Sequence, residues 1–124
     1  NSVILTIPGI STNSASAIIG VIGEFNKFES PKQLVAFAGL DPVVYESGNF
    51  KAISTRMSKR GNSLLRQHLI LTAHNVVRNN QVFKQYYDKK RAEGKNHYNA
   101  LGHCATKLLR VIFKLVKENQ NFNL

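Results

Sequence analysis

A polar stretch from Gly39 to Arg66 holds the residues whose types can act on a phosphodiester. Its hydroxyls stand among cations, and a serine that attacks phosphorus needs Arg or Lys nearby to stabilise the developing negative charge. The candidate nucleophiles are Ser47, Ser54, Ser58 and Ser63. The cations of the stretch are Lys51, Arg56, Lys59, Arg60 and Arg66. Composition does not choose among the serines, most of which form turns in such stretches, but the charge predicts contact with a phosphate backbone.

The charge distribution extends this prediction to the C-terminal part of the chain. The 124 residues carry 17 Lys and Arg against 7 Asp and Glu, a formal charge of +10. Residues 1–46 hold two basic and four acidic side chains, whereas residues 47–124 hold fifteen basic and three acidic ones. A polyanion is therefore the expected partner, and nucleic acid is the favoured one. A basic protein that binds acidic proteins or a membrane surface is the weaker alternative.

Other site chemistries find little support in the sequence. The four histidines and Cys104 lack the short paired spacing of a zinc site, so no metal is expected in this chain. Only two carboxylates, Asp41 and Glu46, lie near the candidate serines. Two are too few for this chain to form a nuclease centre by itself. Cys104 is expected to be a buried thiol without chemistry, in a reducing compartment.

The ends and apolar runs of the sequence indicate where the protein works. No apolar run approaches the length that spans a bilayer, and no charged-then-apolar leader opens the chain. We therefore expect a protein of the cytoplasm. Because the sequence begins at Asn1 without Met, we expect a piece of a longer protein.

Apolar residues at helical spacing predict an all-α fold, with four or five helices in a single domain. About residues 1–40 form the N-terminal part, about residues 41–61 a long basic loop, and about residues 62–118 a helical part. The residues after Glu118 are expected to fray. The expected helices begin at a cap on Thr12 or Asn13, at Pro31 after the cap Ser30, at the cap Asn62, at Gln81 and at the cap Asn96.

The turn at Pro8 and Gly9 resembles the second half of a helix-hairpin-helix, in which an apolar-Pro-Gly-Ile-Gly core leads into a helix. Backbone N–H groups that converge at such a helix N-terminus bind phosphate. An ordinary packing corner without a ligand explains the same residues equally well, and Ser11 stands where the motif prefers Gly. The sequence leaves both interpretations open.

A second basic feature lies on the last predicted helix. Apolar residues recur there every three or four positions and predict a buried face, at Leu101, Cys104, Leu108, Ile112 and Leu115. Cations recur on the opposite face, at Lys107, Arg110, Lys114 and Lys117. Such a stripe is often just the solvated side of a helix, but a stripe with no acidic residue before Glu118 also fits a phosphate backbone. We expect Lys107, Arg110 and Lys114 to bind nucleic acid.

Several short blocks of sequence together resemble the C-terminal domain of insertion-sequence 110 type transposases and of Piv-type DNA invertases. In order they read IPGI, SPKQLVAFAGLDP, YESGNFK, MSKRGNSLLR and CATKLLRVIF, and they cover nearly the whole chain. The resemblance implies a recombinase that cuts and rejoins DNA through a covalent link to a serine. It assigns that serine to the Ser-Gly pair, here Ser47. In the SKRGN block it makes Lys59 and Arg60, with Arg66 next, candidates for contact with the backbone or the transition state.

The resemblance also implies partners that this chain does not contain. In that family a separate N-terminal RuvC-like domain supplies four acidic residues that hold a divalent metal, expected to be magnesium. Homo-oligomers and an association with the nucleoid are expected, and some members are directed by a structured guide RNA. This chain alone is therefore expected to be unable to cleave DNA. The alternative is a non-catalytic helix-hairpin-helix module that only binds nucleic acid.

Overall fold

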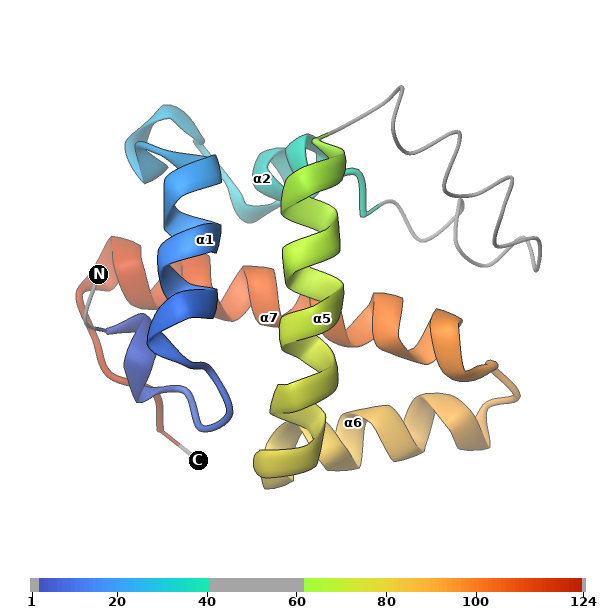
Figure 1. Ribbon diagram of the computed structural model, residues 1–124. Helices are drawn as coiled ribbons and strands as arrows, with labels where there is room; N and C mark the ends of the chain where they lie inside the picture. Colours follow the sequence, from blue (N-terminus) through green and yellow to red (C-terminus); the bar gives the residue numbers. More distant parts are fainter. Residues whose placement is uncertain (1–2, 41–61, 124) are drawn as a thin grey trace.

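The computed structural model describes residues 3–40 and 62–123, and the regular structure in these two ranges is entirely helical. The elements in chain order are the 3₁₀ helix η1 (Ile4–Thr6), α1 (Thr12–Ile22), the 3₁₀ helix η2 (Phe25–Lys27), α2 (Pro31–Ala38), α5 (Ser63–Asn79), α6 (Gln81–Ala92) and α7 (His97–Glu118). The expected all-α class is confirmed there, with five α-helices (Figure 1). None of the helices in these ranges combines the length and apolar character needed to cross a bilayer.

Each of the five α-helices starts at a side-chain cap. Every cap residue has an extended backbone, and its side-chain oxygen accepts a hydrogen bond from a first-turn N–H that has no acceptor within the helix. The caps are Ser11, Ser30, Asn62, Asn80 and Asn96. The predictions for Ser30, Asn62 and Asn96 are confirmed. The predicted cap of α1 at Thr12 or Asn13 is wrong, because Ser11 Oγ accepts from the backbone N–H of Ser14 at 3.1 Å.

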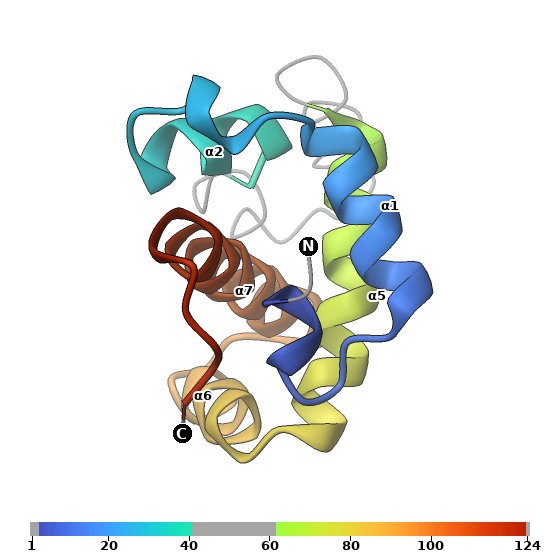
Figure 2. The same ribbon diagram turned by 90° about the vertical axis from the view of Figure 1, so that its left-hand side faces the viewer.

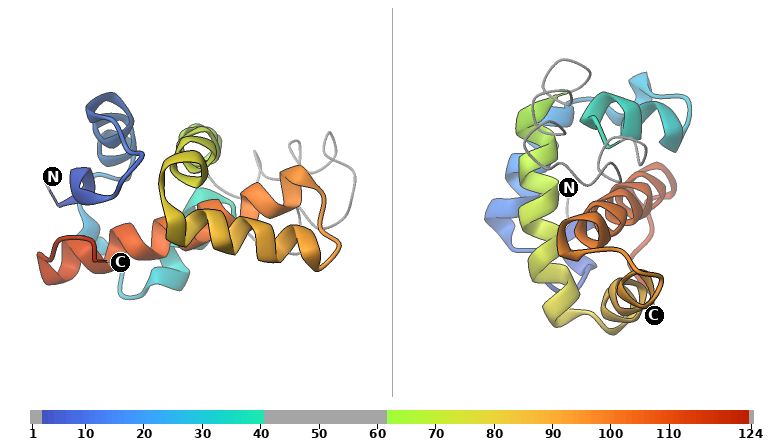
Figure 3. Two further views of the ribbon diagram at one scale, coloured as in Figure 1. Left: turned by 90° about the horizontal axis from the view of Figure 1, so that it is seen from below. Right: turned by 90° about the vertical axis from the view of Figure 1, so that its right-hand side faces the viewer.

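The long helix α7 is the element on which most of the others pack. It contacts α2, α5, α6 and both 3₁₀ helices, while α1 packs on α5. Helix α5 crosses α7, and α6 runs back alongside α7 (Figures 1 and 3). Figure 2 shows α7 between α2 and α6, with α1 beside α5. The predicted buried face of α7 is confirmed at all five positions, Leu101, Cys104, Leu108, Ile112 and Leu115.

The C-terminal tail packs against the N-terminal end of the chain. Asn119 adopts the left-handed conformation that ends α7, with φ 51°. The backbone N–H of Phe122 then donates to Thr6 Oγ1 at 2.8 Å, and the half-buried Phe122 side chain packs on the core. The prediction that the chain frays after Glu118 is therefore wrong as far as residue 123, because an apolar ring in the tail finds core surface to cover.

Candidate nucleic-acid interface

A basic groove of about 360 Å³ lies between α6 and α7. Its lining residues are Tyr86, His103, Thr106, Lys107, Arg110, Val111 and Lys114. All except Tyr86 come from α7, where they share one face because they follow one another at alternating spacings of three residues and one residue. Three of the predicted nucleic-acid-binding residues, Lys107, Arg110 and Lys114, thus meet in one groove.

Lys107 is held against the aromatic rings of α6. Its ammonium group lies 4.9 Å from the centre of the Tyr86 ring and 5.8 Å from that of Phe83. The ammonium group of Lys90 lies 5.3 Å from the same Tyr86 ring. A cation near an aromatic face is attracted by the ring's negative π-surface. Tyr86 therefore lies near two ammonium groups, of which that of Lys107 lines the groove and that of Lys90 is also 3.3 Å from a carboxylate oxygen of Glu93.

The other two groove cations are exposed, and neither forms an ion pair with any carboxylate in the described ranges. From Lys107 to Lys114 the helix rises by about 10 Å. Phosphates of one DNA strand recur about every 3.4 Å along the duplex axis, so the three cations can follow several successive phosphates. Lys117, the fourth member of the predicted stripe, turns elsewhere. Its Nζ donates to Asn26 Oδ1 at 3.4 Å.

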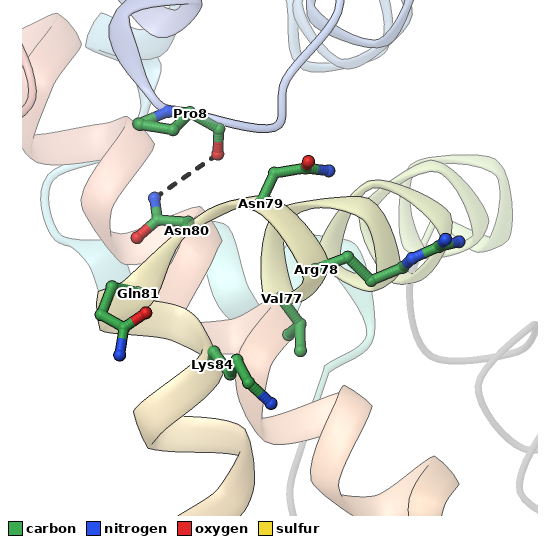
Figure 4. A pocket seen from close by; sticks show the side chains of 7 residues that line it. All are labelled: Pro8, Val77, Arg78, Asn79, Asn80, Gln81 and Lys84. Carbon is green, nitrogen blue, oxygen red and sulfur yellow. Dashed lines mark hydrogen bonds between the residues drawn. The ribbon is translucent and has the colours of Figure 1, made fainter.

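The Pro8–Gly9 turn packs onto α5 and onto the corner between α5 and α6. The carbonyl of Pro8 accepts a hydrogen bond from Asn80 Nδ2 at 3.4 Å (Figure 4). Gly9 has φ +102°, and a Cβ placed on it would lie 2.7 Å from Val76 Cα. Only glycine accepts both the backbone conformation and the close approach. The packing-corner interpretation thus accounts for Gly9, while phosphate binding at this turn stays a prediction.

A second pocket, of about 390 Å³, lies beside that turn. Its lining residues are Pro8, Val77, Arg78, Asn79, Asn80, Gln81 and Lys84. Arg78 and Lys84 extend away from the hydrogen bond between Pro8 and Asn80 (Figure 4). Lys84 is also 3.6 Å from a carboxylate oxygen of Asp88, which offsets part of its charge. This pocket is therefore the weaker candidate for binding a polyanion.

Arg66 lies inside the fold, away from the exposed cations of the groove. Only 7% of its surface is exposed, and its buried Nη1 has no hydrogen-bond partner. Burial lowers the pKa of the guanidinium below its ordinary value. A buried charge without a partner destabilises a fold by several kcal/mol, on the order of the loss seen when a buried ion pair is broken. Arg66 thus lies in a different setting from the groove cations, and its contact with a phosphate stays a prediction.

The predicted nucleophile and four of the predicted cations lie outside the described residues. They are Ser47, Lys51, Arg56, Lys59 and Arg60. The expected basic loop of about residues 41–61 lies outside them as well. The roles assigned to these residues therefore stay predictions. Ser63, another of the four candidate hydroxyls, is the half-buried first residue of α5.

Comparison with known families decides which class of protein has this arrangement. Residues 1–88 match the family model described as the transposase IS116/IS110/IS902 family. The chain belongs to this transposase family. The expected relationship to insertion-sequence 110 type transposases is confirmed.

Individual relatives of this family member include an uncharacterized insertion-element protein, a transposase and a pilin gene-inverting protein. The 43.6 kDa protein of insertion element IS110 from Streptomyces coelicolor is 27% identical over 94% of this chain and 28% of its own length. The transposase of insertion sequence IS1111A from Coxiella burnetii is 38% identical over 68% of this chain and 22% of its own length. The pilin gene-inverting protein of Moraxella lacunata is 27% identical over 98% of this chain and 38% of its own length. The chain thus spans less than two-fifths of each of these relatives.

The sequence of this transposase-family chain did not single out four other residues of the groove. They are Tyr86, His103, Thr106 and Val111. His103 and Thr106 stand four and one residues before Lys107, so helical spacing from the basic stripe was the available signal. Tyr86 could not be found in this way, because it reaches the groove from a different helix.

The described residues of the family member contain no group of three or more His, Cys, Asp or Glu side chains that could hold a metal ion. Two of the histidines here contact each other or a tyrosine. Tyr87 Oη and His97 Nδ1 are hydrogen-bonded at 2.7 Å, and the rings of His74 and His97 meet edge to face with their centres 6.0 Å apart. The described residues therefore do not fit a divalent metal, which the family resemblance places in the separate RuvC-like domain.

Cys104 is fully buried, and this burial raises the pKa of its thiol from 9.0 to about 12. Because the thiolate is the reactive form, we expect iodoacetamide at pH 8 to label the native protein far more slowly than the unfolded protein. Labelling of native and urea-unfolded protein at equal rates would contradict the expected protection of the thiol.

The raised pKa of the Cys104 thiol also predicts a fall in stability from about pH 9 to about pH 12, where only the unfolded chain loses the thiol proton. In Cys104→Ala, the fall in the free energy of unfolding between about pH 9 and about pH 12 should be smaller.

Proposed function

We propose that this family member is the DNA-binding, serine-bearing domain of a transposase or site-specific recombinase. The observation that carries the DNA-binding half of the proposal is the α6–α7 groove. Lys107, Arg110 and Lys114 line it together, and no described carboxylate pairs with any of them. Family membership supports a role in transposition or DNA inversion.

The chemical half of the proposal assigns the nucleophile to Ser47. Its Oγ forms a bond to phosphorus while the bond from phosphorus to one sugar oxygen breaks. A base takes the hydroxyl proton, and the leaving sugar oxygen gains a proton. Attack by the hydroxyl of another DNA end later releases the serine and rejoins the strand. Lys59 and Arg60 stabilise the charge that develops on the phosphoryl oxygens.

The remaining partners of this reaction lie outside the chain. An N-terminal RuvC-like domain would hold the divalent metal, expected to be magnesium, and the metal would supply charge stabilisation for phosphoryl transfer. The chain alone is accordingly inactive. Other copies of the protein, and a guide RNA where the member uses one, complete the complex, which works in the cytoplasm on the nucleoid.

Neutralising the groove should weaken DNA binding and reduce its dependence on salt. Each cation that contacts a phosphate contributes about 0.9 to the slope of log affinity against log salt concentration. In the triple variant Lys107→Gln, Arg110→Gln and Lys114→Gln, we therefore expect a slope smaller by about 2.7. Fluorescence anisotropy with a labelled DNA duplex at several salt concentrations measures both quantities.

A matched control removes three cations that do not line the groove. Lys27, Lys32 and Lys117 are exposed, and they belong to η2, to α2 and to the last turn of α7. Their replacement by Gln changes the net charge by the same amount and should alter the slope by less than about 1. Equal effects of the two triple variants would show that DNA senses only the net charge, which would overturn the groove as the interface.

A further inference from the structure

Arg66 is a buried cation for which the described chain provides no anion. It is 7% exposed, its Nη1 has no hydrogen-bond partner, and the ion pairs among the described residues are those of Lys84 with Asp88 and of Lys90 with Glu93. Buried polar groups in folded proteins are nearly always bonded, and a buried charge is retained only where it has a partner. The partner of Arg66 must therefore come from outside the described residues.

The position of Arg66 in α5 indicates what kind of partner fits. Arg66 is the fourth residue of α5, and its backbone N–H donates to the carbonyl of the cap Asn62 at 3.1 Å. Side chains on a helix lean toward its N-terminus. We therefore expect the guanidinium to lie toward the end of α5 where the helix dipole is positive and where N–H groups lack acceptors within the helix. Both features favour an anion at the same place.

The start of α5 is also fixed in position by another helix. The backbone N–H of Asn62 donates to the carbonyl of Phe37 near the C-terminal end of α2 at 2.7 Å, and the Asn62 side chain caps Leu65 N at 3.0 Å. The first turn of α5 is thereby held before any ligand arrives. A preorganised set of donors binds an anion more tightly than mobile lysines do, because less freedom is lost on binding.

We propose that Arg66 and the first turn of α5 form a phosphate-binding site, which receives one backbone phosphate of the nucleic acid that this protein handles. The planar fork of a guanidinium matches two oxygens of a phosphate. Because the chain has a formal charge of +10, it attracts a polyanion more strongly than a single carboxylate, and this favours a phosphate group of a polyanion as the ligand. The nucleic-acid source rests on the proposed function, whereas phosphate binding itself does not.

Inorganic phosphate tests the site directly in the protein. We expect the melting temperature to rise by about 4 °C when phosphate, added at constant ionic strength, exceeds its dissociation constant tenfold. In Arg66→Met this rise should disappear. Without phosphate, Arg66→Met should melt at or above the temperature of the unaltered protein, because the variant no longer buries an unpaired charge. Arg78→Met, which removes an exposed arginine from the same helix, should keep the full phosphate response.

Two outcomes would overturn the phosphate site. The first is a melting temperature of the unaltered protein that phosphate does not raise, or raises equally in Arg66→Met. The second is a marked fall in melting temperature for Arg66→Met in the absence of phosphate, which would identify a carboxylate or carbonyl of the protein as the partner. If Arg66→Met does not fold, Arg66→Lys serves instead, and a full phosphate response in that variant contradicts a role for the guanidinium fork.

Binding of DNA separates this site from the groove. Arg66→Met should reduce the slope of log affinity against log salt by about 1, since one phosphate contact is lost. The triple groove variant should keep its response to inorganic phosphate. If the protein binds phosphate through Arg66 but does not bind DNA, the proposed function fails and the anion site stands. If DNA binds and Arg66→Met leaves its affinity unchanged, the assignment to a backbone phosphate is wrong.

Discussion

Replacing Ser47 by alanine should abolish the covalent protein–DNA adduct and, with it, recombination. Without the Oγ there is no atom to bond to phosphorus, and loss of a nucleophile lowers the rate of a covalent mechanism by about 10⁴-fold or more. The measurement is trapping of the full-length protein on a nicked suicide substrate, followed by denaturing electrophoresis. DNA affinity should change little, because a neutral hydroxyl contributes little to the salt-dependent part of binding.

The other hydroxyls of the same stretch supply the matched controls. Ser54→Ala, Ser58→Ala and Ser63→Ala remove the same group from neighbouring positions and should still form the adduct. An adduct with Ser47→Ala, or its loss in one of the three controls alone, would assign the nucleophile to a different residue. Under the alternative of a non-catalytic binding module, all four variants recombine DNA as well as the unaltered protein does.

Replacing Gly9 by alanine should destabilise the fold by about 3 kcal/mol or more. The new Cβ would lie 2.7 Å from Val76 Cα and 3.2 Å from the carbonyl oxygen of Asn75, both backbone atoms of α5 that cannot rotate away. The φ of +102° adds the strain of a conformation that L-residues rarely adopt. Urea unfolding followed by circular dichroism gives the free energy of unfolding, and the melting temperature should fall by about 10 °C or more.

Alanine substitutions at two other glycines distinguish the steric clash of an added Cβ from the strain of a positive φ. Gly94 has φ +95° with no atom within 4 Å of an added Cβ, so Gly94→Ala should destabilise by only about 1 kcal/mol. Gly20 is in α1 with open space around it, and Gly20→Ala should stabilise the protein by about 0.5–1 kcal/mol. If Gly9→Ala costs no more than Gly94→Ala, the turn does not need its close approach to α5.

Signals within a few residues were enough to predict most of the described fold. Ser30, Asn62 and Asn96 cap their helices as expected, and Gly39 ends α2 in the left-handed conformation with φ 73°. These features depend on hydrogen bonds between residues three to five positions apart. The buried face of α7 was predictable for a similar reason, since its spacing repeats along a single helix.

The candidate sites were only partly predictable. Lys107, Arg110 and Lys114 were found from their spacing on α7, yet the ring that orients Lys107 belongs to Tyr86 on α6. Arg66 was grouped with exposed cations, because a charged residue near the start of a helix carries no local sign of burial. Ser47 was assigned through resemblance to a family of transposases, which the family match supports without testing the residue.

The sequence by itself determined the helical class, the positions at which most helices begin, the basic character of the C-terminal part and membership of a transposase family. The tertiary structure decided which basic residues line a groove, that Arg66 is buried, that Gly9 must be glycine, and that the tail packs. Phe122 and Thr6 show the physical reason, because they bond to each other across 116 positions of sequence. Contacts of that kind depend on how helices pack together, so they cannot be predicted from any short stretch of the sequence.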